Sequence, residues 1–194
     1  MRAKTRLLRR LWIWLIVLSV LAGLTLLLKL GYRRYLQTAY PLTYGELVHT
    51  YAEEYALPPS LIFAVIRTES SFHPDAVSTA NAMGLMQLTA GTFEWAQSRS
   101  PEDEKLPAGE LFDPETNIRY GALVLSLLGE MFEDGDARLA AYNAGMGNVR
   151  RWLADSQYSD DGVTLARIPY EETREYIERV RSAQEMYQTL YQIE

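Results

Sequence analysis

The sequence predicts a mainly helical protein, with one apolar helix near the N-terminus followed by an all-α body. Three observations support this prediction. Residues 11–28 contain no charged side chain and are long enough for a helix that crosses a bilayer. Apolar residues in the remainder recur at spacings of three and four, which is the helical period. No stretch of the body alternates polar and apolar residues over the length of a useful strand.

The N-terminal apolar run is flanked unequally by basic residues. Five precede it and three follow it closely, a bias that favours the N-terminus inside and the body outside the bacterial cytoplasmic membrane. A cleaved signal peptide is the alternative, but the run is long for one and no A-x-A-like site closely follows. We therefore expect a single-pass membrane protein, divided into a cytoplasmic basic tail (1–10), a transmembrane anchor (11–30), a tether (31–42) and a helical body (43–194).

Composition excludes several classes of function. The chain has no cysteine and two histidines, so we expect neither a metal site nor another cofactor. The first 34 residues carry eight basic residues and no acid, which leaves a net charge of −14 on the rest. A nucleic-acid-binding domain would need a basic surface, so we expect no nucleic-acid partner.

The body opens with two predicted helices. Thr43 and Glu46 match a capping box that would begin the first. The second begins at "LPPS", because Pro58 and Pro59 are tolerated only in a first turn, and it ends before the His-Pro step at residues 73–74. Residues 75–88 lack a clear period and are predicted to form a loop, after which Thr89 caps a third helix.

One loop and four further helices complete the predicted body. Residues 98–110 are charged and contain proline, which indicates an exposed loop. "FDPETN" then begins a helix with Asp113 as its cap and proline at the first helical position. Asp136 or a neighbour begins the next, "ARLAAYNAG", which stops at glycine; Asn148 is expected to cap "VRRWLAD", and a last helix runs from about Glu171.

Glu69 is the residue that a helical scaffold alone does not explain. If residues 62–72 are helical, Glu69 falls within about 20° of Ile62 on the apolar face. Burial and the C-terminal end of the helix dipole both favour the protonated acid, the form that can protonate a glycosidic oxygen. The alternative is a structural glutamate paired with an arginine or held by hydrogen bonds.

Two other stretches carry polar groups suited to a sugar. In "AMGLMQLT", Gly84 allows the backbone to approach a ligand and Gln87 offers an amide donor and acceptor. In "AAYNAGMGN", Tyr142 and Asn143 lie at a helix end. Each stretch also has a purely structural interpretation, as a loop before a helix cap and as an ordinary glycine stop.

Taken together and in this order, these stretches resemble the soluble lytic transglycosylase (SLT-type) family, enzymes with a lysozyme-like fold related to the goose-type lysozymes. The resemblance runs from about Tyr44 to about Tyr191. It rests on six segments in register: the short motifs "ES", "GLMQ" and "AYNAG", and the longer stretches "LPPSLIFAVIRTESSFHPDAVS", which contains "ES", "FDPETNIRYGALVL" and "IPYEETREYIERV".

The resemblance implies a peptidoglycan-cleaving lyase, with residues 43–194 as its lytic transglycosylase catalytic domain. Glu69 would be the catalytic acid and base, which protonates the oxygen between N-acetylmuramic acid and N-acetylglucosamine and then accepts the proton of the muramoyl C6 hydroxyl as a 1,6-anhydro ring closes. The implied substrate-binding residues are Ser78, which supports the intermediate, Gln87, Tyr142 and Asn143, which line the cleft, and Glu172 and Tyr176, a second acid and an aromatic. Glu171 competes with its neighbour for the role of that second acid.

The chain departs from the family pattern at two places. "GLMQ" is often followed by a Met-Pro step, where this chain has Leu88-Thr89-Ala90, and "AYNAG" is often followed by Pro-Gly, where it has Met146-Gly147. These departures bear on loop geometry and subsite preference.

Two alternative functions also follow from the same residues: a goose-type hydrolase of the same bond, and a peptidoglycan-binding module without catalysis. The expected partners are peptidoglycan strands and, through residues 11–30, the membrane; the sequence does not identify a protein partner.

Overall fold

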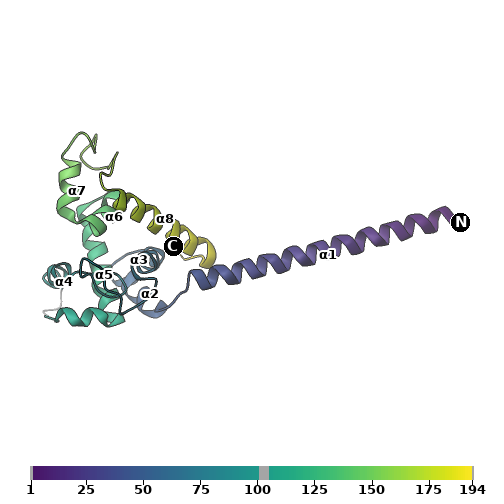
Figure 1. The fold of residues 1–194 in the computed structure, drawn as a ribbon, viewed down its shortest axis with the longest axis horizontal. Coiled ribbons are helices and arrows are strands. Elements are labelled where there is room, and N and C mark those ends of the chain that lie inside the picture. The colour runs from purple at the N-terminus through teal and green to yellow at the C-terminus, as the bar shows by residue number, and fades with distance from the viewer. Residues whose placement is uncertain (1, 101–104, 194) are drawn as a thin grey trace. The chain divides into compact units, whose positions relative to one another are not determined.

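The computed structural model describes residues 2–100 and 105–193, with side chains from Trp12 onward. The chain divides into two compact units, Met1–Pro41 and Leu42–Glu194. The predicted fold class is confirmed: the described residues form helices and loops, and their β-pairing is confined to two isolated bridges. Each unit is described by itself (Figure 1).

The first unit consists of one long helix, α1 (Arg2–Ala39). Its segment Trp12–Ala39 is long and apolar enough to cross a membrane, and none of it is buried. At 28 residues this segment extends about 42 Å, more than a hydrocarbon layer of about 30 Å. The helix therefore covers the predicted anchor and continues through most of the predicted tether; residue 1 of the predicted basic tail lies outside the described residues.

The two hydroxyl side chains within the apolar run do not present unsatisfied groups. Ser19 donates to the carbonyl of Ile16 at 2.9 Å, and Thr25 donates to that of Ala22 at 2.8 Å. Such local bonds matter in hydrocarbon because no water is present to solvate a hydroxyl hydrogen.

The second unit contains one helix, α3, that is buried over most of its length. Every residue of α3 from Ser60 to Ile66 is buried, so the helix is covered on all sides rather than along one face. It packs mainly against α8 and also against α2. Phe63 stacks on Tyr187 of α8 with 5.2 Å between ring centroids. The elements of this unit are α2 (Gly45–Glu54), α3 (Pro59–Ser70), α4 (Ala90–Gln97), the 3-10 helix η1 (Ala108–Phe112), α5 (Pro114–Met131), α6 (Gly135–Ala144), α7 (Met146–Leu153) and α8 (Glu171–Tyr191).

The helix starts test the predicted caps. Thr89 and Asp113 accept hydrogen bonds from the backbone three residues ahead, as predicted, and the neighbour of Asp136 that caps α6 is Asp134. The capping box at Thr43 is wrong: α2 begins after Tyr44, which has a left-handed backbone (φ 61°) and makes no side-chain cap bond. The Asn148 cap is also wrong, because α7 begins earlier, at Met146, and the Asn148 amide donates to the carbonyl of Ala144 instead.

The segment predicted as an exposed loop at residues 98–110 includes the start of a helix. The 3-10 helix η1 begins at Ala108, and its Leu111 is buried completely. Residues 101–104 of this segment lie outside the described residues. A short helix was not expected here because its single buried apolar side chain gives no periodic signal.

Candidate active site

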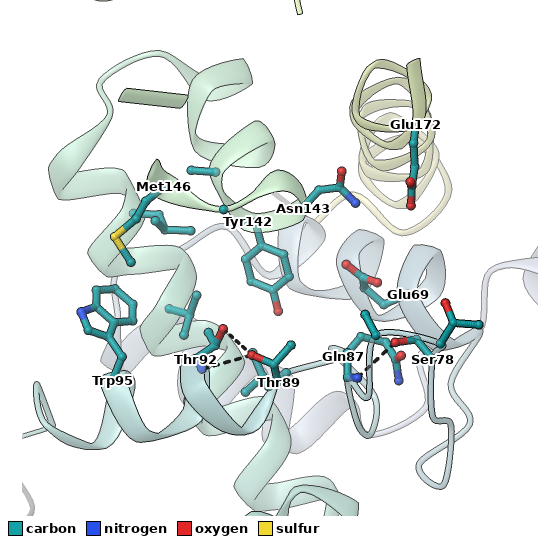
Figure 2. Close-up of a pocket in the computed structure, with 18 residues that line it drawn as sticks. Glu69, Ser78, Gln87, Thr89, Thr92, Trp95, Tyr142, Asn143, Met146 and Glu172 are labelled. Atoms are coloured by element: carbon teal, nitrogen blue, oxygen red, sulfur yellow. Dashed lines mark hydrogen bonds between the residues drawn. The ribbon is translucent and has the colours of Figure 1, made fainter. Parts of the chain in front are cut away.

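Glu69 lies in the last turn of α3, where the chain leaves the core. The helix ends at Ser71, whose left-handed backbone (φ 49°) turns the chain sharply. The Glu69 side chain lines a cavity of about 310 Å³ at this end of the helix. The sequence predicted a cleft at this point, and the structure contains one (Figure 2).

Burial dominates the electrostatics of Glu69. Removal from water raises the pKa of its carboxyl from 4.5 to about 7. The Tyr176 hydroxyl and the positive charge of Arg179 lower this pKa, whereas the negative charge of Glu172 raises it. Arg179 acts from a largely exposed position, and the described residues that line the cavity include no arginine or lysine. The alternative of a structural glutamate neutralised by a buried cation therefore does not describe this site.

The loop after α3 is built around a buried asparagine of α5. Asn117 accepts a hydrogen bond from the Met86 amide at 2.7 Å and donates to the carbonyls of Met83 and Leu111. Gly84 lies against it, and a Cβ at that position would come within 2.1 Å of the Asn117 amide nitrogen. Asn117 was not singled out from sequence, because its role depends on contacts across more than thirty residues of chain.

Gln87 lines the cavity, but the nitrogen of its side-chain amide already makes hydrogen bonds within the loop. It lies in the left-handed region (φ 51°), and its Nε2 donates to the carbonyls of Ala76 and Gly84. Both amide hydrogens are thus engaged, so Oε1 is the group that can meet a ligand. The expectation that Gln87 offers both a donor and an acceptor is wrong in this respect.

Ser78 also lines the cavity, from an earlier part of the same loop. Its Oγ accepts a hydrogen bond from the Ala82 amide at 3.1 Å. This contact fixes the hydroxyl oxygen and leaves the hydroxyl hydrogen able to donate.

Tyr142 and Asn143 enter the cavity from the end of α6. The Tyr142 hydroxyl donates to the Met86 carbonyl at 2.8 Å, which joins α6 to the loop that carries Gln87. Asn143 accepts from the Thr173 hydroxyl of α8 at 2.8 Å, so its amide nitrogen is the part left for the cleft. Burial and the nearby Glu69 charge both raise the pKa of Tyr142, which keeps it a neutral hydroxyl.

The two predicted residues of α8 differ in position. Glu172 is exposed and lines the cavity across from Glu69, whereas Glu171 is not among the lining residues (Figure 2). Tyr176 is buried beside Glu69 and does not line the cavity. Its hydroxyl oxygen has no hydrogen-bond partner of ordinary geometry among the described residues, although its proximity lowers the pKa of Glu69. Tyr176 thus lies behind the acid rather than on a surface that a sugar would touch.

The cavity has a second part that sequence reasoning missed. Its further lining residues include Thr89 and Thr92 at the start of α4, Trp95 on the same helix, and Met146 at the start of α7, over Val124 and Leu128 of α5. The available signal was the pair of departures from the family pattern, since Thr89 and Met146 both belong to them. Among the described residues, no group of three or more potential ligands could hold a metal ion.

This helical domain has a lysozyme-like fold, and its cleft contains one desolvated carboxyl among polar groups. These features define the class of glycan-cleaving proteins. The model of the transglycosylase SLT domain family matches residues 46–163, and the chain belongs to this family.

The similarity to individual lytic transglycosylases supports this family assignment. The chain is 37% identical over 150 residues to the soluble lytic murein transglycosylase of Escherichia coli K12, covering 75% of this chain and 23% of that protein. It is 33% identical over 165 residues to the membrane-bound lytic murein transglycosylase C of Shigella sonnei, covering 74% of this chain and 46% of that protein. The chain therefore matches between about a quarter and about half of the length of these relatives.

A solved structure shares the fold. It is an inactive glutamate-to-glutamine mutant of the lytic transglycosylase Slt from Pseudomonas aeruginosa, with a TM-score of 0.70 and 35% sequence identity. The similarity covers 80% of this chain and 26% of that one.

Proposed function

We propose that this chain is a membrane-anchored lytic transglycosylase of peptidoglycan. It cleaves the β-1,4 bond between N-acetylmuramic acid and N-acetylglucosamine without water and leaves 1,6-anhydro-muramoyl ends. The observation that carries the proposal is Glu69, whose buried carboxyl has a pKa raised to about 7 and faces a polar cleft in a chain of this family.

Glu69 acts first as a general acid. At neutral pH a large fraction of its carboxyl holds a proton, which it donates to the glycosidic oxygen as the bond to the muramoyl C1 breaks. Positive charge then develops on the sugar ring, beside a carboxyl that has just become negative. The Ser78 hydroxyl hydrogen and the Asn143 amide lie in the same cavity and hold the sugar in place.

The same carboxylate then acts as a general base. It removes the proton from the muramoyl C6 hydroxyl as that oxygen bonds to C1, so the acid ends the cycle protonated as it began. One group with a pKa near neutrality suits both transfers, because neither its loss nor its gain of a proton is strongly uphill. The usual two-carboxylate glycosidase scheme instead needs one carboxyl that stays ionised.

The products distinguish this reaction from its alternatives. We would incubate the full chain, purified in detergent, with isolated sacculi and analyse the released fragments by mass spectrometry. The proposal predicts 1,6-anhydro ends. Reducing muramic acid ends would instead mean hydrolysis, and binding without release would mean a recognition module.

Two variants test the acid. Glu69→Gln keeps the shape but cannot transfer the proton, and it should reduce turnover by about 100-fold to 10,000-fold. Glu172→Gln should reduce turnover less, because Glu172 is exposed at the cavity wall, and Glu171→Gln is its matched control outside the lining. Equal losses of turnover from Glu172→Gln and Glu171→Gln would mean that Glu172 does not belong to the site.

We also propose that α1 anchors the protein in the bacterial cytoplasmic membrane, with the body outside. The length of the apolar segment and the internal bonding of Ser19 and Thr25 support insertion. The excess of basic residues before the run supports this orientation. An uncleaved anchor predicts that the protein stays in the membrane fraction after alkaline carbonate washing, with its N-terminus intact by mass spectrometry. A shortened, released chain would indicate a signal peptide.

A further inference from the structure

Helix α1 carries a cluster of cations just after its apolar run, in the unit that does not contain the cleft. Lys29, Arg33 and Arg34 lie within six residues of one another along the chain, and all three are exposed. We call these three residues the basic collar. Insertion into a membrane does not require them, because basic residues after the run work against the orientation that the five basic residues before it favour. Another interaction must therefore account for the basic collar.

The geometry of α1 places the basic collar at the edge of a hydrocarbon layer. The helix is continuous, and from Trp12 to Tyr32 it rises over about 20 residues, or about 30 Å, which is the thickness of that layer (Figure 1). Trp and Tyr side chains favour the two membrane–water interfaces. Lys29 then lies about one turn inside the second interface and reaches it through its flexible side chain. The two arginines lie just outside, at the depth of the lipid headgroups.

The basic collar and the neighbouring tyrosines occupy different faces of the helix. At about 100° per residue, the three cations fall within an arc of about 140°. Tyr32 and Tyr35 lie about 60° apart and outside this arc, and they are 63% and 68% exposed. An aromatic face and a basic face at one depth suit a phospholipid, whose apolar and glycerol parts meet the rings and whose phosphate meets the cations.

The basic collar has no countercharge within its own unit. Residues 1–45 contain no aspartate or glutamate, and the residues four positions before and after Lys29 are Thr25 and Arg33. Like charges at this helical spacing repel each other, so an external anion would stabilise the helix here. Each arginine presents a planar fork of N–H donors, which matches the oxygens of a phosphate group.

We propose that the basic collar binds the phosphate of anionic phospholipids, such as phosphatidylglycerol, in preference to zwitterionic ones. The phosphate of a zwitterionic lipid is already neutralised by the cation of its own headgroup. Each cation near an anionic headgroup favours association by about fivefold. Bound lipid would fix the depth of α1 and thus the point at which the chain leaves the membrane. The inference rests on the proposed anchor, and it depends neither on the side of the membrane that the body occupies nor on catalysis.

Fluorescence quenching by brominated lipids tests the proposal in vesicles. The reporter is the full chain with Trp12→Phe, Trp14→Phe and Tyr35→Trp, so its one tryptophan within residues 1–41 lies beside the basic collar. The same chain without the change at Tyr35 gives the emission of Trp95 and Trp152, which is subtracted. The vesicles are phosphatidylcholine with increasing fractions of brominated phosphatidylglycerol or, in a second series, of brominated phosphatidylcholine.

The two quenching curves give the ratio of association of the anionic to the zwitterionic lipid. We expect a ratio of at least about five at low salt and a smaller one at about 0.5 M salt, because salt screens exposed charges. Adding Lys29→Gln, Arg33→Gln and Arg34→Gln to the reporter should bring the ratio to about one. The pair Arg33→Lys and Arg34→Lys keeps the charge and should keep most of the preference.

The matched control removes three cations from the other end of the apolar run, through Arg6→Gln, Arg9→Gln and Arg10→Gln. It should leave the ratio at the reporter unchanged. Because both leaflets of the vesicles have the same composition, a change of orientation in this control does not alter the ratio.

Three results would overturn the proposal. The first is an unchanged ratio after the three collar replacements, and the second is an equal fall of the ratio in the matched control. The third is a ratio of about one in the parent reporter; a lower Tm of the collar variant would then mean that the acidic body supplies the countercharge. Equal quenching by both lipids would still keep the proposed anchor, whereas no quenching by either lipid would overturn the anchor as well. The 1,6-anhydro products are measured separately, so the proposed reaction stands or falls independently.

Discussion

Replacing the proposed catalytic acid should make the protein more stable. Glu69 has a pKa of about 7 in the folded state, compared with 4.5 in an unfolded chain. Between these values the folded state holds a proton that the unfolded state has released, so the free energy of unfolding falls as the pH rises. The full difference corresponds to about 3 kcal/mol and is reached above pH 7.

Glu69→Gln removes this penalty, because the amide cannot ionise. We expect the variant and the parent to have similar stability below pH 4.5. The variant should then gain progressively and become about 3 kcal/mol more stable above pH 7. For a chain of this size that gain corresponds to roughly 6–12 °C in Tm. The variant should keep no more than about 1% of the parent's turnover at any pH, which separates stability from function at one position.

The full chain in detergent would be unfolded by heat and by urea at pH 4.5 and at pH 8. Near-ultraviolet circular dichroism would monitor the unfolding. Glu185→Gln on the exposed face of α8 is the control and should change the free energy of unfolding by no more than about 0.5 kcal/mol at either pH. A stability difference for Glu69→Gln that is the same at both pH values would refute the reasoning. It would mean that the carboxylate is not penalised by burial.

Three further predictions concern the groups around the acid. Tyr176→Phe should raise the pKa of Glu69 and move the basic limb of the kcat/KM profile to higher pH, since the hydroxyl lowers that pKa; an unmoved limb would contradict this. Asn117→Leu should cost about 3 kcal/mol in urea unfolding through the loss of three hydrogen bonds, and a cost below about 1 kcal/mol would show that the loop holds without it. Gly84→Ala should prevent stable folding, because its Cβ would overlap Asn117 and its φ is +77°, whereas Gly91→Ala meets nothing within 4 Å and should be tolerated; equal Tm values for the two would refute the close packing.

Features encoded in a few consecutive residues were predictable. Asp113 and its following proline define the start of α5 without help from the rest of the fold, because a cap needs only the next turn of helix. Glu69 stood out for a similar reason, since one acid among apolar residues at helical spacing is visible in the sequence alone. The same local logic failed at Thr43, where the left-handed Tyr44 takes the cap position without a side-chain bond.

Features that depend on distant contacts were not predictable. Asn117 and Met86 are 31 residues apart, and nothing in either segment specifies their hydrogen bond. Trp95 follows the helical period of α4 and gave no separate signal, yet the fold turns it into the cleft. Tyr176 was expected to line the cleft; it lies one turn after Glu172 on α8, buried beside Glu69 and outside the cavity lining, and this depth in the fold is not visible in the sequence.

The proposed role of Glu69 in two proton transfers depends on its place at the end of a buried helix. Residues 60–66 of α3 are buried, and Glu69, about one turn further on, is half-buried at the cavity. Its partial removal from water raises its pKa, and a buried cation would lower that pKa again. The neighbours that the fold supplies are instead the neutral hydroxyls of Tyr142 and Tyr176, whose own pKa values are raised well above their usual range. Because the neighbouring tyrosines are neutral and the charge of Arg179 acts from an exposed position, the pKa of Glu69 remains near 7, where the carboxyl can both give and take a proton.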